Sequence, residues 1–78
     1  MKVYIIIPAY NEETAIAKVI ADIKHIIPLS ELIVVDDGSQ DQTAPEARMA
    51  GAIVLRHIIN RGQGAALQTG VDYALRHG

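Results

Sequence analysis

Cysteine is absent from this chain, the net charge is small and the apolar runs are short. Without cysteine, the chain has neither disulfide bridges nor thiolate metal sites. A formal net charge of −2, with acidic and basic residues interspersed, gives no electrostatic basis for nucleic-acid binding. The amino-terminal apolar run soon meets two glutamates, and the other runs end within a few residues. The sequence therefore predicts neither a membrane span nor a signal peptide, and a cytoplasmic location is the expectation.

The 78 residues correspond to one small domain or a part of one. A chain of this size buries only about 60–65% of the surface exposed in its unfolded form, so its stability is marginal unless something else covers it. Half of the residues are hydrophobic, which suffices for a packed core and argues against disorder.

Strand and helix patterns alternate three times along the chain. Apolar runs predict strands over residues 3–7, 32–35 and 52–55, and helical spacing predicts helices over about 12–27, 43–50 and 64–76. Asn11 and Thr43 are the expected helix caps. The last helix is expected to bury four apolar side chains, Leu67, Val71, Ala74 and Leu75. Short connections and right-handed crossovers then imply a three-layer, Rossmann-like α/β fold with a parallel sheet in the order 3-2-1.

In this order the predicted first strand, Val3 to Ile7, has no neighbour on its outer side. An apolar strand with an unpaired edge is a template for association. A homo-oligomer joined through this edge is therefore one expectation for the chain.

Three connections leave the carboxyl ends of the predicted strands and should meet at one edge of the sheet, where open α/β folds bind ligands. The first connection offers the Tyr10 ring for stacking on a base and Asn11 and Glu12 for hydrogen bonding. A proline-initiated turn with a helix cap explains the same residues without any ligand, and for this segment alone we prefer that explanation.

The second connection begins with two adjacent carboxylates, Asp36 and Asp37, after a β-branched run. Burying carboxylates without partners is costly, so a nucleotide, a metal ion or the backbone of the next turn should meet them. We assign Asp37 to a ligand, and we assign three of the polar side chains that follow it to local turn and capping bonds: Ser39, Asp41 and Thr43.

The third connection places Gly62 and Gly64 before a helix, where small residues and the helix N-terminus favour phosphate. The match to a dinucleotide-binding Gly-x-Gly-x-x-Gly fingerprint fails, because Leu67 replaces the third glycine and the segment follows the third strand. A dehydrogenase half also needs glycines directly after the first strand, where this chain has Pro8 to Asn11. The three histidines lack metal-ligand spacing, and His57 is interpreted as a bystander.

Together, residues 5–13, 34–43 and 60–70 resemble the N-terminal nucleotide-binding part of a family 2 glycosyltransferase with the GT-A fold. The resemblance extends to the dolichol-phosphate mannosyltransferase-like, polyprenyl-phosphate branch. It implies that five residues bind the donor nucleoside: Pro8, Tyr10, Glu12, Val35 and Asp37. It also implies that four residues lie on the diphosphate and sugar side: Arg61, Gly62, Gln63 and Gly64. Many relatives carry a basic residue at the position of Gln63, which weakens the diphosphate contact expected there.

The resemblance further implies an inverting transfer of a sugar from a UDP- or GDP-linked donor, with a polyprenyl phosphate as one acceptor class. In the full-length family, an Asp-x-Asp motif in a following strand binds Mg²⁺ or Mn²⁺. That strand does not occur in these 78 residues, so we expect no metal site, no catalytic residue and no transfer by this chain alone. The alternative is a non-catalytic α/β module that self-associates through its first strand.

Overall fold

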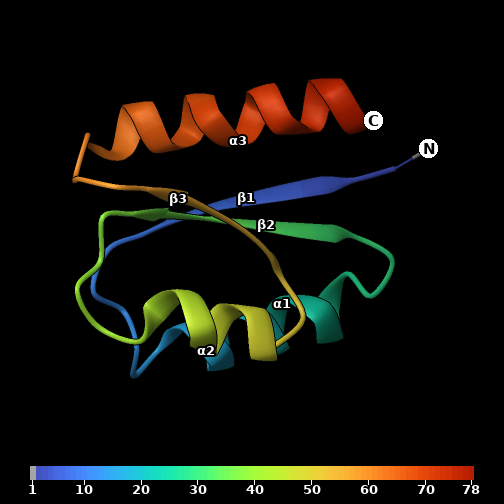
Figure 1. Ribbon diagram of the computed structural model, residues 1–78. Helices are drawn as coiled ribbons and strands as arrows, with labels where there is room; N and C mark the ends of the chain where they lie inside the picture. The colour runs from blue at the N-terminus through green and yellow to red at the C-terminus, as the bar shows by residue number, and fades with distance from the viewer. Residues whose placement is uncertain (1) are drawn as a thin grey trace.

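A computed structural model describes residues 2–78 of the chain (Figure 1). The strands are β1 (Tyr4–Ala9), β2 (Glu31–Asp37) and β3 (Ile53–His57), and the helices are α1 (Ile16–Ile26), α2 (Thr43–Met49) and α3 (Gln63–His77). Figure 1 shows α1 and α2 on one face of the sheet and α3 on the opposite face. The three-layer α/β architecture expected from the sequence is confirmed.

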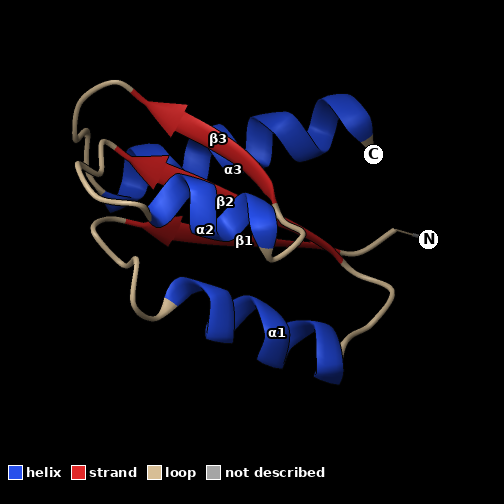
Figure 2. Cartoon of the chain, turned by 60° about the horizontal axis from the view of Figure 1, so that its bottom comes forward, coloured by secondary structure: helices blue, strands red, loops and turns tan. Residues whose placement is uncertain are grey.

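The sheet is parallel and has the order β1-β2-β3, which confirms the predicted 3-2-1 arrangement. All three strands point the same way, so the connections to the helices gather at one edge (Figure 2). Strands β2 and β3 extend two residues further than predicted, as far as Asp37 and His57. These two residues are register partners, so the ladder continues into the edge where the connections meet.

Alternate residues of the central strand β2 supply two separate cores, as the period of two in a strand requires. Leu32 and Val34 pack toward α1 and α2, where they meet Ile16 and Ile20. On the other face, Ile33 and Val35 pack beneath α3. Strand β2 therefore holds the two helical layers together, and every side chain from Leu32 to Asp37 is buried.

The packing of α3 corrects one prediction. Three of the four residues expected to be buried are at least two-fifths exposed: Leu67, Val71 and Leu75. The helix instead turns its small residues toward the sheet, namely Ala66, Gly70 and Ala74. A Cβ built on Gly70 would lie 2.4 Å from the Ile6 side chain. Close approach of α3 to β1 thus selects the small face of the helix and leaves the larger apolar face outside.

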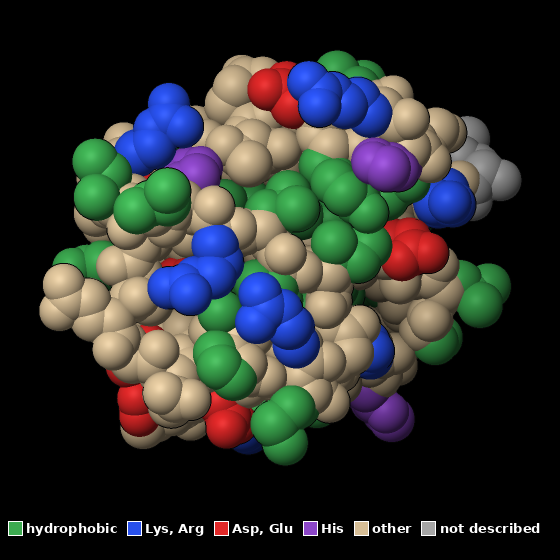
Figure 3. All heavy atoms as spheres, in the orientation of Figure 1, with side chains coloured by type: hydrophobic (Ala, Val, Ile, Leu, Met, Phe, Trp, Pro, Cys, Tyr) green, Lys and Arg blue, Asp and Glu red, His purple; other side chains and the backbone are tan. Residues whose placement is uncertain are grey.

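Within the described residues, β1 pairs only with β2, so its other edge has no strand partner. Hydrophobic side chains also remain visible between α3 and β3 (Figure 3). Leu55 and Tyr73 line a shallow hollow there. The sheet therefore has an unpaired edge at β1 and a partly uncovered apolar surface between α3 and β3.

Candidate functional site

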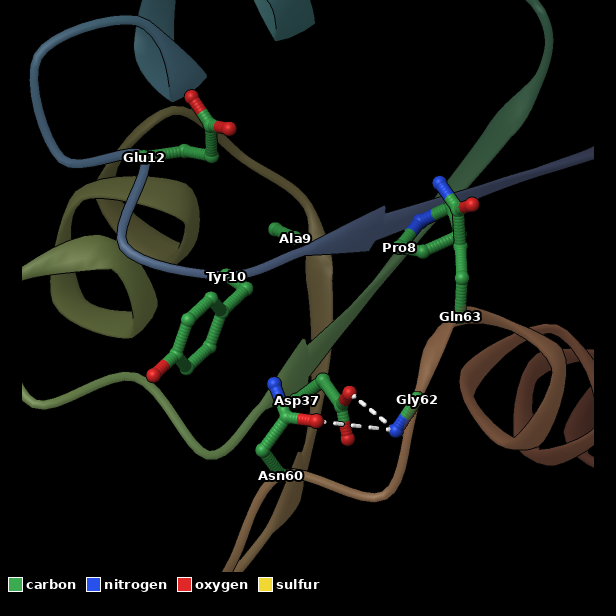
Figure 4. A pocket seen from close by; sticks show the side chains of 8 residues that line it. All are labelled: Pro8, Ala9, Tyr10, Glu12, Asp37, Asn60, Gly62 and Gln63. Atoms are coloured by element: carbon green, nitrogen blue, oxygen red, sulfur yellow. Dashed lines mark hydrogen bonds between the residues drawn. The ribbon is translucent and has the colours of Figure 1, made fainter.

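The carboxyl edge of the sheet contains a cleft of about 430 Å³. Figure 4 shows the residues that line it: Pro8, Ala9, Tyr10, Glu12, Asp37, Asn60, Gly62 and Gln63. Six of them were singled out from the sequence, and they come from all three connections. We call residues 10–15 the first loop, 38–42 the second loop and 58–62 the third loop.

Three of the predicted site residues do not line this cleft. Val35 is fully buried in the core beneath α3, so the structure does not bring it to a position where it could touch a base. Arg61 and Gly64 are exposed beside the cleft without lining it. Conversely, Ala9 and Asn60 line it and were missed. Asn60 belongs to the third of the segments that carried the family resemblance, and this membership could have identified it as a site residue.

The first loop is fastened to the second loop and the start of α2 by five hydrogen bonds. Three successive backbone N–H groups of the first loop donate to side chains: Asn11 to Ser39 Oγ (2.8 Å), Glu12 to Thr43 Oγ1 (2.8 Å) and Glu13 to Asp41 Oδ2 (3.2 Å). Two bonds run the other way, from Gln40 N to Asn11 Oδ1 (3.0 Å) and from Gln42 N to Glu13 Oε1 (3.2 Å). We refer to these five bonds as the cross-loop bonds.

The cross-loop bonds correct the predicted roles of Asn11, Ser39 and Thr43. Asn11 does not cap α1; it adopts a positive φ of 51° and its side chain accepts a bond from the second loop. Thr43 is the first residue of α2 rather than its cap. The predicted local bonds are present between Asp41 and Thr43, since Asp41 Oδ1 accepts the Thr43 N–H at 2.9 Å and also the Thr43 hydroxyl. The other oxygen of Asp41 accepts the Glu13 N–H.

The Asp37 carboxylate fastens the third loop. Its Oδ1 accepts the Arg61 N–H and its Oδ2 accepts the Gly62 N–H, both at 2.8 Å. Asn60 Oδ1 shares the Gly62 N–H at 3.1 Å, and Figure 4 shows both side chains directed at that amide. The predicted ligand-binding carboxylate therefore also holds one wall of the cleft in place.

Asp37 is ionised over a wide pH range. The Arg61 N–H contributes most to lowering its pKa, followed by the hydrogen bond from the His57 ring, while burial opposes them. An ionised carboxylate only accepts hydrogen bonds, and each oxygen accepts about two. Oδ2 holds one bond and so has capacity for a further donor from the cleft.

His57, interpreted from the sequence as a bystander, is buried and has a polar partner at each ring nitrogen. Its Nδ1 lies 2.7 Å from Asp37 Oδ1, and its Nε2 lies 2.8 Å from Thr69 Oγ1 on α3. The contact follows from the strand register that pairs Asp37 with His57, which one sequence alone does not specify.

Asp36 meets partners within the chain rather than a ligand. Its Oδ1 accepts the Ser39 N–H at 3.0 Å, which is the bond to the following turn that the sequence left open. Arg56 Nε lies 3.1 Å from Oδ2 as an ion pair without hydrogen-bond alignment. The same guanidinium donates to the Ser39 carbonyl at 3.1 Å, so Asp36 and Arg56 together brace the second loop.

The carboxylates at this edge do not fit a divalent metal. Such an ion needs several oxygen ligands, and the oxygens of Asp36, Asp37 and Asp41 already face N–H groups, a hydroxyl or a guanidinium. Over residues 2–78, no cluster of three or more histidines and acids has the geometry to hold a metal. None of the helices in these residues is long and apolar enough to cross a bilayer.

Comparison with known proteins identifies the family. The model for glycosyl transferase family 2 matches residues 4–76. The chain belongs to this family. An uncharacterized protein of Methanocaldococcus jannaschii is 43% identical over 74 residues, which cover 95% of this chain and 30% of that protein. A polyprenol monophosphomannose synthase of Mycolicibacterium smegmatis is 37% identical over 81 residues, with coverage of 95% and 30%.

One solved glycosyltransferase structure has the same fold over most of this chain. It is the glucosyl-3-phosphoglycerate synthase from Mycobacterium tuberculosis in complex with Mn²⁺ and UDP-glucose. The TM-score is 0.72 at 36% identity, over 85% of this chain and 27% of the synthase. The predicted GT-A fold and the resemblance to polyprenyl-phosphate glycosyltransferases are thus confirmed, while the chain spans less than a third of the length of these relatives.

Proposed function

We propose that residues 1–78 are the N-terminal nucleotide-binding part of an inverting glycosyltransferase. This part holds the nucleoside diphosphate of a UDP- or GDP-linked sugar, and the acceptor of the whole enzyme is a polyprenyl phosphate. Family membership, the cleft at the sheet edge and the relatives named as polyprenyl-phosphate transferases support the proposal.

The observation that carries the proposal is the ionised Asp37 at the floor of the cleft. Uracil and guanine each present a ring N–H, which suits the remaining acceptor capacity of Oδ2. Tyr10 lines the same cleft and is 48% exposed, so its ring is accessible for stacking on the base. Pro8 and Glu12 complete the nucleoside side. Exclusion of water strengthens the charge-assisted bond to Asp37.

The diphosphate is assigned to the start of α3. Gly62 precedes this 15-residue helix with a φ of 98°, and Gln63 and Gly64 form its first turn. The N–H groups of a first turn have no partners within the helix and carry the positive end of its dipole. Phosphate groups bind readily at such positions, and the exposed Arg61 adds a positive charge beside them.

In the whole enzyme, an acceptor oxygen attacks the anomeric carbon while the bond to the nucleoside diphosphate breaks on the opposite face. A divalent metal stabilises the departing diphosphate in the family. The residues of this chain do not supply that metal site, so their part is to bind and orient the nucleoside. We expect no sugar transfer by the 78 residues alone.

An amide-shift NMR titration with UDP, GDP and NAD, each with and without Mn²⁺, tests the proposal. We expect saturable shifts at Tyr10, Asp37 and Gly62 with UDP or GDP, and little dependence on Mn²⁺. A preference for NAD would favour a dinucleotide-binding half instead. The absence of any saturable shift would overturn nucleotide binding by this chain.

The unpaired edge of β1 favours a second candidate function, a non-catalytic module that self-associates through this strand. Two copies joined along β1 would continue the sheet and cover the bare backbone groups. Sedimentation equilibrium separates the two candidates. A concentration-dependent dimer without nucleotide binding favours assembly, whereas a monomer that binds UDP or GDP favours the donor site.

A further inference from the structure

The buried His57 takes no direct part in the proposed nucleotide contacts, yet it bonds the residue that carries them. Its side chain is 6% exposed, and that of Asp37 is 5% exposed. Because the ionised carboxylate only accepts, the Nδ1 atom must carry the proton that joins the two side chains at 2.7 Å. His57 therefore determines which groups Asp37 Oδ1 can meet.

The bond from His57 leaves Asp37 with one usable oxygen. Oδ1 accepts two hydrogen bonds, from His57 Nδ1 and from the Arg61 N–H, which fills its ordinary capacity. Oδ2 accepts only the Gly62 N–H. With Oδ1 held from two sides, the carboxylate resists rotation, and Oδ2 stays on the side of the cleft.

The far side of the imidazole is anchored to α3. His57 Nε2 lies 2.8 Å from Thr69 Oγ1, and the same hydroxyl donates to the Ala65 carbonyl at 3.0 Å, one turn back in the helix. The ring thus spans from β2 to α3. The orientation of the Asp37 carboxylate therefore depends, through this ring, on the position of the helix whose first turn borders the cleft.

We infer that His57 is a positioning residue for base recognition: it holds the Asp37 carboxylate so that Oδ2 accepts the ring N–H of uracil or guanine. The inference rests on the proposed function. A histidine that merely stabilised the fold would raise the affinity for all nucleotides equally. A positioning histidine raises the affinity for nucleotides whose base has a ring N–H more than for nucleotides whose base lacks one.

Two substitutions separate the two ends of the ring. In His57→Asn the amide N–H takes the place of Nδ1–H, so the bond to Asp37 is retained and the contact with Thr69 is lost. In His57→Gln the longer side chain directs its amide toward Thr69 and releases Asp37. His25→Gln, on the exposed part of α1, is the matched control.

The measured quantity is a ratio of dissociation constants from amide-shift titrations. CDP is compared with UDP, and ADP with GDP, because cytosine and adenine carry no proton on the corresponding ring nitrogen. We expect the ring N–H to favour binding to the unmodified chain by about tenfold, the scale of a hydrogen bond to a charged group. His57→Asn and His25→Gln should keep the ratio, and His57→Gln should bring it close to one.

Equal weakening of both nucleotides by His57→Gln, with the ratio preserved, would overturn the inference but not the proposed function. Failure of the unmodified chain to bind any nucleotide would overturn both. Circular dichroism checks that each variant folds. Should His57→Gln unfold, His57→Leu provides the test, because it keeps an apolar side chain in the buried position and removes both ring nitrogens. A ratio close to one supports the inference, and an unchanged ratio overturns it.

A nucleotide-free spectrum adds an independent readout. In a long-range ¹⁵N spectrum at neutral pH, the His57 ring should carry a slowly exchanging proton on Nδ1. A ring protonated only on Nε2 would contradict the bond to Asp37 and overturn the inference. Loss of protection at the Arg61 and Gly62 amides in His57→Gln, but not in His57→Asn, would support it.

Discussion

The first and second loops are joined by five hydrogen bonds shared among eight residues, whereas the third loop depends on one carboxylate, that of Asp37. In the first case each bond joins a different pair of residues, so the loss of one leaves four. In the second case both loop amides and the His57 ring meet the same group. Loss of a single hydrogen bond should therefore be tolerated between the first and second loops, whereas loss of the Asp37 carboxylate should strongly disturb the third loop.

The largest effect is expected from Asp37→Asn. The amide that replaces one oxygen cannot accept from the backbone N–H facing it, and the negative charge that meets the His57 ring is lost. We expect nucleotide affinity to fall at least tenfold and the thermal midpoint to fall by about 20 °C. The measurements are an NMR titration and thermal unfolding by circular dichroism.

Asp22→Asn, on the exposed face of α1, is the control for Asp37→Asn and should change the midpoint little. Unchanged amide shifts at Arg61 and Gly62 in Asp37→Asn would show that the third loop does not depend on this carboxylate.

Gly38→Ala should be the next most damaging change, because it forces the second and third loops apart. Gly38 has a φ of 81°, and a Cβ there would lie 2.5 Å from Asn60 N. We expect a loss of about 2–3 kcal/mol in the free energy of unfolding by urea.

Gly64→Ala is the matched glycine change, since a Cβ there meets nothing within 4 Å and the residue is helical. It should raise the free energy of unfolding by up to about 1 kcal/mol. Equal effects of the two glycine variants would contradict the close approach of the loops at Gly38.

Substitutions that remove a single cross-loop bond should destabilise the fold less than Asp37→Asn or Gly38→Ala. Thr43→Val keeps the shape of a buried side chain and removes the acceptor for the Glu12 N–H. Ser39→Ala does the same for Asn11. Each should cost about 1–2 kcal/mol in urea unfolding and leave the base preference unchanged. Thr14→Val, at an exposed position, is the control. Loss of nucleotide binding in either variant would show that the first and second loops are as sensitive to a single substitution as the third loop.

Acid should produce the smallest and most gradual change. The pKa of Asp37 is lowered as described above. Burial raises the pKa of Asp41, but the Thr43 hydroxyl and N–H and the Glu13 N–H outweigh it, so that pKa also lies below the ordinary 3.8. The unfolded chain therefore takes up protons first as the pH falls.

The stability contributed by the two carboxylates is complete above about pH 5 and is lost as the pH falls below 3.8. Thermal midpoints between pH 6 and 2 measure this loss. Asp41→Asn should make the decline shallower, because it removes the contribution of the carboxylate that joins the first and second loops. A midpoint that does not change down to pH 2 would contradict the lowered pKa values.

The sequence predicted the features that depend on chain order and period. Alternating strand and helix patterns imply a parallel sheet, and a parallel sheet brings its carboxyl ends together. The family resemblance then pointed to particular residues at that edge, and six of them line the cleft. It did not predict contacts that depend on register. The bonds of Asn11 to Ser39 and of Asp37 to His57 join residues 28 and 20 positions apart. Local patterns explain such polar residues equally well as caps or bystanders.

The error in the packing of α3 and the buried position of Val35 have simple physical causes. Helix α3 carries two stripes at a spacing of four, one large and one small, and hydrophobicity alone favours the large stripe of Leu67, Val71 and Leu75. The short distance between α3 and β1 allows only the small stripe to face the sheet, because even a Cβ on Gly70 would collide with Ile6. For Val35, the strand alternation places it with Ile33 beneath α3. The same alternation, read from the sequence, predicts this buried position for Val35.

The cross-loop bonds also bear on how donor preference can evolve. The N–H groups of Asn11, Glu12 and Glu13 already donate to the second loop and to the first residue of α2. Under the proposed function, the first loop would therefore meet a nucleotide with side chains rather than with these N–H groups. Mutation exchanges side chains and leaves the backbone in place. The side chains of Tyr10 and Glu12 take part in none of the cross-loop bonds, so under the proposed function their exchange would change the nucleotide contacts and leave the scaffold intact.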